Sequence, residues 1–268
     1  MKNLQVGDLV LECGRPKIAV PLTGKTHEEI LRQCGTLLEM PCDILEWRVD
    51  YFLENMENID EKLASDEAQI AIIRILDDID YVTKGMPVIF TVRNKSQGGR
   101  STLSKEQVYD LNSLAAQSQL VKFVDVELLD DNNKLVRDVL VGHIDDIHSF
   151  GCRVIMSYHD FKAMPQMEEI FNLVDVMRNF GADISKVAAF AHNKKDAVNM
   201  IKCANVLTQG DKDPVILIGM GKNGLITRII GGQYGSVITF ASLEETTANG
   251  QMDVKTVKRL LDEYYVNQ

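Results

Sequence analysis

Eight short apolar runs, rich in β-branched and aromatic residues, recur along this chain, and stretches with helical spacing lie between them. Strands that alternate with helices are typical of a parallel sheet. Eight such units in 268 residues indicate an α/β fold of the (β/α)8 TIM-barrel type. A doubly wound open sheet permits the same alternation and stays open at this point. The runs are residues 17–22, 43–49, 87–92, 122–128, 153–158, 186–190, 214–219 and 236–240; the clearest helical stretches are residues 27–39, 105–117, 165–181, 196–207 and 253–265.

Ahead of the first run, LQVGDLVLECGRPK (residues 4–17) is typical of a β-hairpin, which we expect to close the bottom of the barrel. The chain has six prolines and no Ser/Gly tract, low-complexity segment or repeat that would mark a linker. We therefore expect one barrel domain spanning residues 1–268.

Charge and cysteine content narrow the expected partners and compartment. The formal net charge is -10, which disfavours nucleic acids and anionic membranes because phosphate binding needs a basic surface. A small anionic substrate stays possible if a few arginines are focused in a cleft. The five cysteines lack CxxC spacing, which favours a reducing cytosol over disulfides or a zinc site. No run approaches the roughly 18 apolar residues of a membrane span, and we expect a soluble cytoplasmic protein.

Polar residues interrupt the strands near their carboxyl ends, which face the active-site mouth in a barrel. In LEWRVD, Glu46, Arg48 and Asp50 alternate, so we expect all three on one side of the strand. They would form either a hydroxyl-binding rim or a structural ion pair. Arg93 follows the third run at the expected mouth, and Gln97 lies in the Gly-rich loop beyond it.

The fourth and fifth runs carry further candidates. Asp125 and Glu127 share one face of VDVEL, where buried carboxylates more often order other polar groups than act as acids. His159 and Asp160 follow the fifth run in SYHDF. Histidine titrates near neutrality, so a histidine at the mouth of a barrel suits general acid–base chemistry.

The sixth run carries a lysine, Lys186, inside the apolar sequence ADISKVAAFAH (residues 182–192). Its following neighbours on the strand are Val187, Ala188 and Ala189. Removal of an ammonium from water favours the neutral amine, which can condense with a ketone to an imine. The alternative is a lysine at the rim whose charged end reaches water.

The seventh run leads into GMGKNG (residues 219–224), which satisfies the GxGxxG pattern. Only one more strand follows, whereas a dinucleotide-binding half needs two, so we do not predict a dinucleotide site. We expect the glycines to let the backbone approach a ligand closely. Arg228 could clamp a carboxylate, and TTANGQ (residues 246–251) would close the far side of the mouth.

Taken together, these motifs resemble the type I 3-dehydroquinases, the imine-forming lyases of the shikimate pathway. The resemblance runs from end to end through DILEWRVDYF, FTVRNKSQGG, VIMSYHDF, GADISKVA, LITRIIGGQYGSVITF and NGQM. It implies a (β/α)8 barrel, a homodimer, and neither a metal nor an organic cofactor. It also implies syn loss of water from 3-dehydroquinate, a small anion, to give 3-dehydroshikimate.

The resemblance also implies roles for individual residues. Lys186 would form the imine with the C3 ketone, and His159 would remove the C2 proton and protonate the departing C1 hydroxyl. Arg228 would grip the substrate carboxylate, with Gln251 beside it. The other matches are the hydroxyl-binding residues Glu46, Arg48 and Arg93 and the apolar pocket walls Met220, Phe161 and Phe240.

The chain departs from the family pattern in three places. The family usually has a glutamate at Gln97, where it hydrogen-bonds the catalytic histidine. We expect the amide to orient the ring but to leave the pKa of His159 lower, with slower turnover. VAAFAHNKKD replaces the more usual Met-Pro after Lys186, and in the last loop Thr247 keeps a hydroxyl while Asn249 replaces a proline. The alternatives are a paralogue for quinate breakdown or another keto acid, a class I aldolase, or a binding relative weakened by Gln97.

Overall fold

The computed structural model describes residues 1–129, 135, 137–244 and 246–266, and its main sheet has eight parallel strands. Their order is β10-β3-β4-β5-β6-β7-β8-β9. A bridge between Val215 and Ser236 links β9 to the segment before β10, so the sheet is a nearly closed barrel and the open-sheet alternative is wrong. The strands are β3 (Lys17–Leu22), β4 (Ile44–Arg48), β5 (Val88–Thr91), β6 (Phe123–Glu127), β7 (Arg153–Asp160), β8 (Ile184–Phe190), β9 (Val215–Met220) and β10 (Ile238–Phe240).

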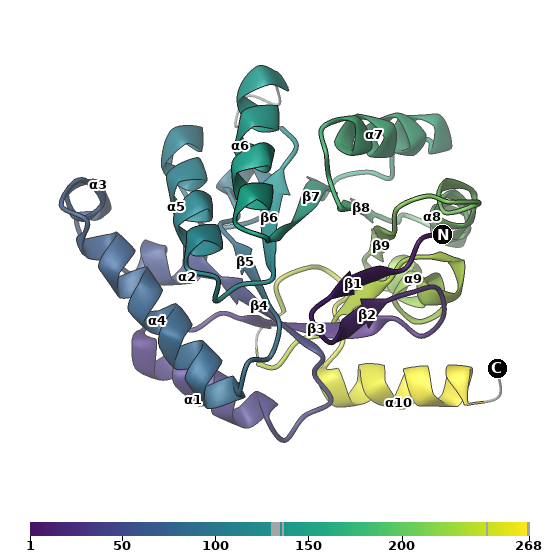
Figure 1. Ribbon diagram of the computed structural model, residues 1–268. Helices are drawn as coiled ribbons and strands as arrows, with labels where there is room; N and C mark the ends of the chain where they lie inside the picture. Colours follow the sequence, from purple (N-terminus) through teal and green to yellow (C-terminus); the bar gives the residue numbers. More distant parts are fainter. Residues whose placement is uncertain (130–134, 136, 245, 267–268) are drawn as a thin grey trace.

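Helices follow the strands and surround the barrel (Figure 1). The predicted helical stretches are confirmed as α1, α5, α7, α8 and α10, with ends that differ by up to two residues. None of the described helices is long and apolar enough to cross a membrane. The helices are α1 (His27–Leu37), α2 (Val49–Glu54), α3 (Ile59–Ala64), α4 (Glu67–Thr83), α5 (Lys105–Gln117), α6 (Arg137–Ser149), α7 (Met167–Asn179), α8 (Lys194–Leu207), α9 (Leu225–Ile230) and α10 (Val254–Tyr265).

Local sequence fixes where several helices begin. The Ser104 side chain accepts from the Gln107 amide, and the Gln107 side chain accepts from the Ser104 amide, which is a capping box at the start of α5. Asn193 and Asp196 form the same reciprocal pair at the start of α8. These caps satisfy amide groups that the first turn of a helix leaves unpaired, and they fix the residues at which α5 and α8 begin.

Because side chains alternate along a strand, the sheet separates two apolar clusters. Trp47 and Phe90 point outward and belong to the larger cluster beneath the helices. The smaller cluster fills the interior of the barrel near the amino ends of the strands, and it comprises mainly Ile44, Ile89, Phe123, Ile155, Ile184, Ile216 and Ile238.

The predicted hairpin is confirmed as β1 (Leu4–Val6) and β2 (Leu9–Leu11), which pair antiparallel. Gly7, with φ of 59°, provides the left-handed conformation that the tight turn between them needs. Val6 and Leu11 are buried in the interior cluster beside the first inward residues of the strands. The hairpin therefore closes the amino end of the barrel and leaves the carboxyl end for a binding site.

Three predicted boundaries near the site need correction. Backbone pairing with β8 continues through His159 and Asp160, so β7 includes both residues instead of ending before them. Strand β8 begins at Ile184, which places Lys186 inside the strand. Asp50 does not lie on β4, because the chain turns into α2 directly after Arg48.

Candidate active site

A polar pocket occupies the carboxyl end of the barrel. Side chains two residues apart on a strand share a face, and on β6 the inward positions run from apolar Phe123 to Asp125 and Glu127. On β7 they run from Ile155 to Ser157 and His159, and on β8 from Ile184 to Lys186. The pocket lining includes all twelve side chains expected from the sequence: Lys186, His159, Gln97, Glu46, Arg48, Arg93, Arg228, Thr247, Gln251, Met220, Phe161 and Phe240.

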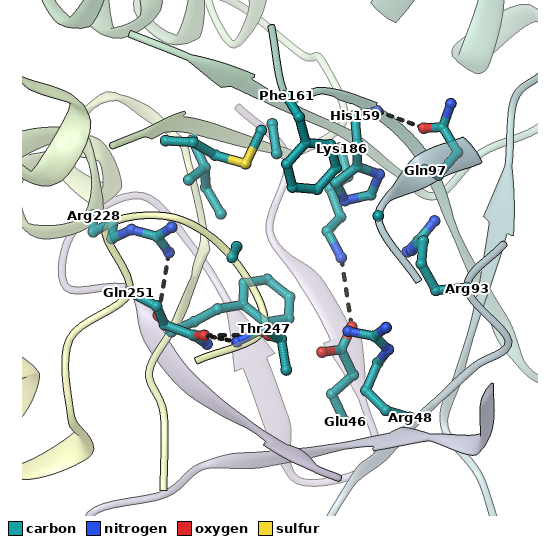
Figure 2. A pocket seen from close by; sticks show the side chains of 16 residues that line it. Glu46, Arg48, Arg93, Gln97, His159, Phe161, Lys186, Arg228, Thr247 and Gln251 are labelled. Carbon is teal, nitrogen blue, oxygen red and sulfur yellow. Dashed lines mark hydrogen bonds and ion pairs between the residues drawn. The ribbon is translucent and has the colours of Figure 1, made fainter. Parts of the chain in front are cut away.

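Lys186 is buried and points into the pocket toward Glu46 (Figure 2). Its Nζ lies 3.1 Å from Asp125 Oδ2 and 3.6 Å from Glu46 Oε1. The same nitrogen lies 4.4 Å from the centre of the Phe240 ring. The amine is inside the barrel, as one of the two sequence alternatives held. Two carboxylates and an aromatic face surround it, and its apolar neighbours along the strand gave no indication of them.

Arg93 and Asp125 form the centre of a buried ion network. Arg93 Nη2 lies 2.8 Å from Asp125 Oδ1, and Nη1 donates to Glu127 Oε1 at 3.1 Å. Burial alone would raise the pKa of Asp125, yet the Arg93 guanidinium and the Lys186 ammonium hold it well below its usual range. For Glu127 burial prevails and raises the pKa. Asp125 is therefore an anion throughout the working range of an enzyme.

A second ion pair holds Arg48. Asp50 accepts from Arg48 Nε at 2.8 Å and from Nη2 at 2.7 Å, which is the bidentate geometry that fixes a guanidinium most firmly. Asp50 also accepts from the Arg100 backbone amide at 3.0 Å. One carboxylate thus positions an arginine of the pocket and ties α2 to the loop that carries Gln97. Arg48 therefore belongs to a structural ion pair with Asp50, and it also lines the pocket.

His159 is partly buried, with several cations nearby. Burial, with Arg93 and Lys186 nearby, lowers its pKa well below 6.5, so the ring is neutral at pH 7. Its Nδ1 has no hydrogen-bond partner among the described residues. Gln97 Oε1 accepts from the His159 backbone amide at 2.8 Å. The amide therefore fixes the main chain of the histidine, and the expectation that it orients the ring directly is wrong.

Phe161 covers one side of His159, with near-parallel rings whose centres lie 6.3 Å apart. Gly98, next to Gln97, makes this arrangement possible. Its φ is 80°, and a Cβ there would lie 2.2 Å from the Phe161 ring. The left-handed glycine thus lets the loop after β5 pass against the aromatic wall of the pocket.

Arg228 lies across the pocket from Glu46, beside Gln251 (Figure 2). Its Nη1 donates to the Phe240 carbonyl at 3.2 Å, and its Nε has no partner among the described residues. Burial lowers the pKa of Arg228 to about 10. It remains charged at pH 7, and no carboxylate of the described residues pairs with it. A buried cation in this state suits an anionic ligand.

The last loop forms the lip of the pocket beside Arg228. Gln251 Oε1 accepts from the Thr247 backbone amide at 2.7 Å, and Gln251 Nε2 donates to the Ala241 carbonyl at 3.0 Å. The Asn249 carbonyl accepts from the Gly221 amide at 2.9 Å. A Cβ on Gly250 would lie 2.7 Å from the Gly221 carbonyl oxygen. Gly250 therefore lets the last loop pass directly against the backbone at Gly221.

Two polar residues around Lys186 were not assigned from the sequence. Asp125 had been weighed but given no role, and Ser157 was overlooked. Ser157 is fully buried and pairs with Lys186 in the register of β7 and β8. Counting inward positions back from His159 would have found Ser157, because alternate residues share a face.

The fold and the pocket define a (β/α)8-barrel protein with a pocket at the carboxyl end of its strands. One lysine, one neutral histidine and one arginine that pairs with no carboxylate of the described residues line that pocket. A sequence model of the family described as type I 3-dehydroquinase matches residues 18–268. The chain therefore belongs to the type I 3-dehydroquinase family.

Individual relatives agree with this assignment along the whole chain. A 3-dehydroquinate dehydratase of Klebsiella pneumoniae subsp. pneumoniae is 34% identical over 260 residues, which cover 96% of each chain. That of Alkaliphilus oremlandii is 33% identical over 263 residues, with 97% of this chain and 96% of the relative covered. The crystal structure of a type I 3-dehydroquinate dehydratase from Clostridium difficile matches with a TM-score of 0.87 and 29% identity, covering 100% of this chain and 99% of that one.

Proposed function

We propose that the chain dehydrates 3-dehydroquinate to 3-dehydroshikimate in the shikimate pathway, through an imine on Lys186. The observation that carries this proposal is the buried Lys186 amine, which opens on the same cavity as the neutral imidazole of His159. Family membership makes a dehydratase the expected enzyme class and disfavours the class I aldolase alternative.

The two sides of the pocket would bind different groups of the substrate, its carboxylate on one side and its hydroxyls on the other. Arg228 has no carboxylate partner among the described residues, so the substrate carboxylate would pair with it, next to Thr247 and Gln251. Glu46 and Arg48 face the substrate hydroxyls from β4. Arg93 completes that hydroxyl-binding side, while Met220, Phe161 and Phe240 form the apolar walls around the ring.

The first stage forms the imine. Lys186 transfers a proton to His159. The lowered pKa of His159 leaves the ring unprotonated at pH 7, so its acceptor nitrogen is free, although the same shift makes the ring a weaker base. The free amine adds to the C3 carbonyl, and the resulting carbinolamine loses its hydroxyl as water with a proton from the imidazolium. The cationic iminium that remains is an electron sink beside C2.

The second stage eliminates water. His159 removes a C2 proton, and the C–H electron pair forms the enamine. The enamine expels the C1 hydroxyl, which takes the proton back from His159 and leaves as water. Hydrolysis of the conjugated iminium consumes one water and restores the Lys186 amine. Because imine formation released one water, the net reaction is the loss of one water from the substrate.

The chain would act as a single barrel domain, as a homodimer, in a reducing cytoplasm. All five cysteines are free thiols in the structure. Size-exclusion chromatography with light scattering tests the dimer, for which a monomeric mass at working concentration would be the contrary result.

Replacement of Lys186 by Met tests the proposed function directly. The product enone absorbs in the ultraviolet, so dehydration can be followed continuously. We expect Lys186→Met to lose at least about 1,000-fold in kcat, because nucleophilic catalysis has no substitute in the pocket. Lys195→Met, which removes an exposed lysine at the start of α8, is the matched control and should keep full activity. Dehydration at the parent rate by Lys186→Met would refute the imine mechanism.

A further inference from the structure

The two oxygens of the Asp125 carboxylate contact different partners, and one of these partners is Lys186. Asp125 Oδ2 contacts Lys186 Nζ at 3.1 Å. Asp125 Oδ1 lies 2.8 Å from Arg93 Nη2 and accepts a hydrogen bond from the Ser157 hydroxyl at 2.6 Å. The same hydroxyl oxygen accepts from Arg93 Nη1 at 2.7 Å. The Ser157 hydroxyl thus bridges Arg93 Nη1 and Asp125 Oδ1, while Nη2 contacts the same carboxylate oxygen directly.

This bridge has a geometric consequence. Arginine prefers to bind a carboxylate with two parallel hydrogen bonds, one to each oxygen. If Arg93 gripped Asp125 in that way, Oδ2 would turn toward the guanidinium and away from Lys186. Ser157 shares Nη1 with Glu127 Oε1, which accepts from it at 3.1 Å, and adds a second donor to Oδ1. This keeps Arg93 on one oxygen of Asp125 and leaves the other oxygen to the lysine.

The register of the sheet explains why a serine can do this. Ser157 and Lys186 are direct partners in the pairing of β7 with β8, so both side chains stand inside the barrel at the same level. Ser157 is fully buried, and its short hydroxyl reaches Asp125 on the adjacent strand β6. It lies two residues before His159 on the same face.

We propose that Ser157 is a positioning residue for the imine chemistry, acting through Asp125 to place the amine of Lys186. This inference rests on the proposed imine mechanism. Ser157 is not among the described residues that line the pocket; its hydroxyl sets which carboxylate oxygen faces the amine. When the lysine becomes an iminium, the nitrogen keeps its positive charge, and Asp125 Oδ2 remains available as its counterion at the same position.

Ser157→Ala tests the proposal. A hydrogen bond to a charged group is worth roughly a tenfold change or more in an equilibrium constant, so we expect kcat to fall about tenfold. The single-turnover rate at which borohydride traps substrate on the enzyme should fall by the same factor, while KM changes less than about twofold because the substrate contacts remain. Ser157→Thr keeps the hydroxyl and should recover most of the trapping rate.

A matched control and a double variant separate positioning from structural damage. Ser185→Ala removes a buried strand hydroxyl that has no hydrogen-bond partner among the described residues, and it should leave the trapping rate unchanged. In an Asp125→Asn background, adding Ser157→Ala should cost less than about twofold, because residues that act through one another are not additive. An equal loss from Ser157→Ala in both backgrounds, or no loss in the parent, would overturn the proposal. If the parent itself formed no adduct with substrate, the imine mechanism would fail instead.

Discussion

Arg228 is a buried cation with which no carboxylate of the described residues pairs, so we predict opposite effects of its replacement on stability and on function. We expect Arg228→Met to make the empty protein more stable and to weaken substrate binding. Methionine fills similar space without a charge and adapts to irregular cavities. Residues kept for binding often reduce stability in this way.

The expected magnitude comes from the effect of burial on the arginine. Burial lowers the pKa of Arg228 from the ordinary value of an arginine to about 10, and at about 1.36 kcal/mol per pKa unit this corresponds to roughly 3 kcal/mol. The folded state disfavours the protonated base, so this cost is fully present below pH 10 and disappears only above the ordinary pKa of an arginine. Removing the hydrogen bond to the Phe240 carbonyl costs about 1 kcal/mol, which leaves a net gain of about 2 kcal/mol.

Thermal unfolding at pH 7 without ligand measures the first half of the prediction. At about 2–4 °C per kcal/mol for a chain of this size, Arg228→Met should unfold roughly 4–8 °C above the parent. Steady-state kinetics measure the second half. Loss of a charge-assisted contact to the substrate carboxylate should raise KM by roughly 10- to 100-fold.

The control is Arg259→Met, which removes an exposed arginine paired with Glu263. Exposed ion pairs contribute little, so its Tm should stay within about 2 °C of the parent and its KM should not change. If Arg228→Met lowered the Tm and left KM unchanged, the arginine would be a structural residue. The assignment of the substrate carboxylate to that side of the pocket would then be wrong.

Other predictions concern the histidine and the loop that supports it. The acidic limb of the parent pH–rate profile should lie below pH 6.5, because the pKa of His159 is lowered and the neutral ring is the base. Gln97→Glu should move that limb to higher pH and increase kcat, since a buried carboxylate favours the imidazolium; an unmoved profile would make the charge irrelevant here. Gly98→Ala should lower both stability and kcat, because its Cβ would meet the Phe161 ring at 2.2 Å. Circular dichroism melts and initial rates check this, and an unchanged Tm would contradict it.

The sequence was a good guide to which residues meet, because the carboxyl ends of parallel strands gather at one end of a barrel. Arg93, His159 and Lys186 belong to three different strands or their ends, and yet they line one cavity. The closing hairpin also followed from its pattern. Counting the strand units was therefore enough to predict which distant residues share the pocket, without any knowledge of side-chain contacts.

The sequence was a poor guide to what each side chain touches. Lys186 was judged by its neighbours along β8, but Val187 points outward into the helix layer. The groups that surround the amine, Asp125 and Glu46, come from other strands. Their distance from Lys186 depends on the registers of β4, β6, β7 and β8 together.

Gln97 and Asp50 show the same limit at shorter range. The side chain of Gln97 was expected to reach the imidazole, and the structure instead directs it to the His159 backbone amide. Asp50 was placed on the strand by alternation, although the chain turns into α2 one residue earlier. Both errors concern residues that follow the end of a strand. The alternation of side chains along a strand carries no information about the direction that the chain takes after the strand ends.

A mass spectrum of the enzyme quenched with borohydride during turnover tests the central claim most directly. Reduction converts an imine to a stable secondary amine, so the account predicts one substrate-sized adduct, which peptide mapping should locate on Lys186. An adduct on another lysine, or rapid dehydration of 3-dehydroquinate with no adduct, would contradict it.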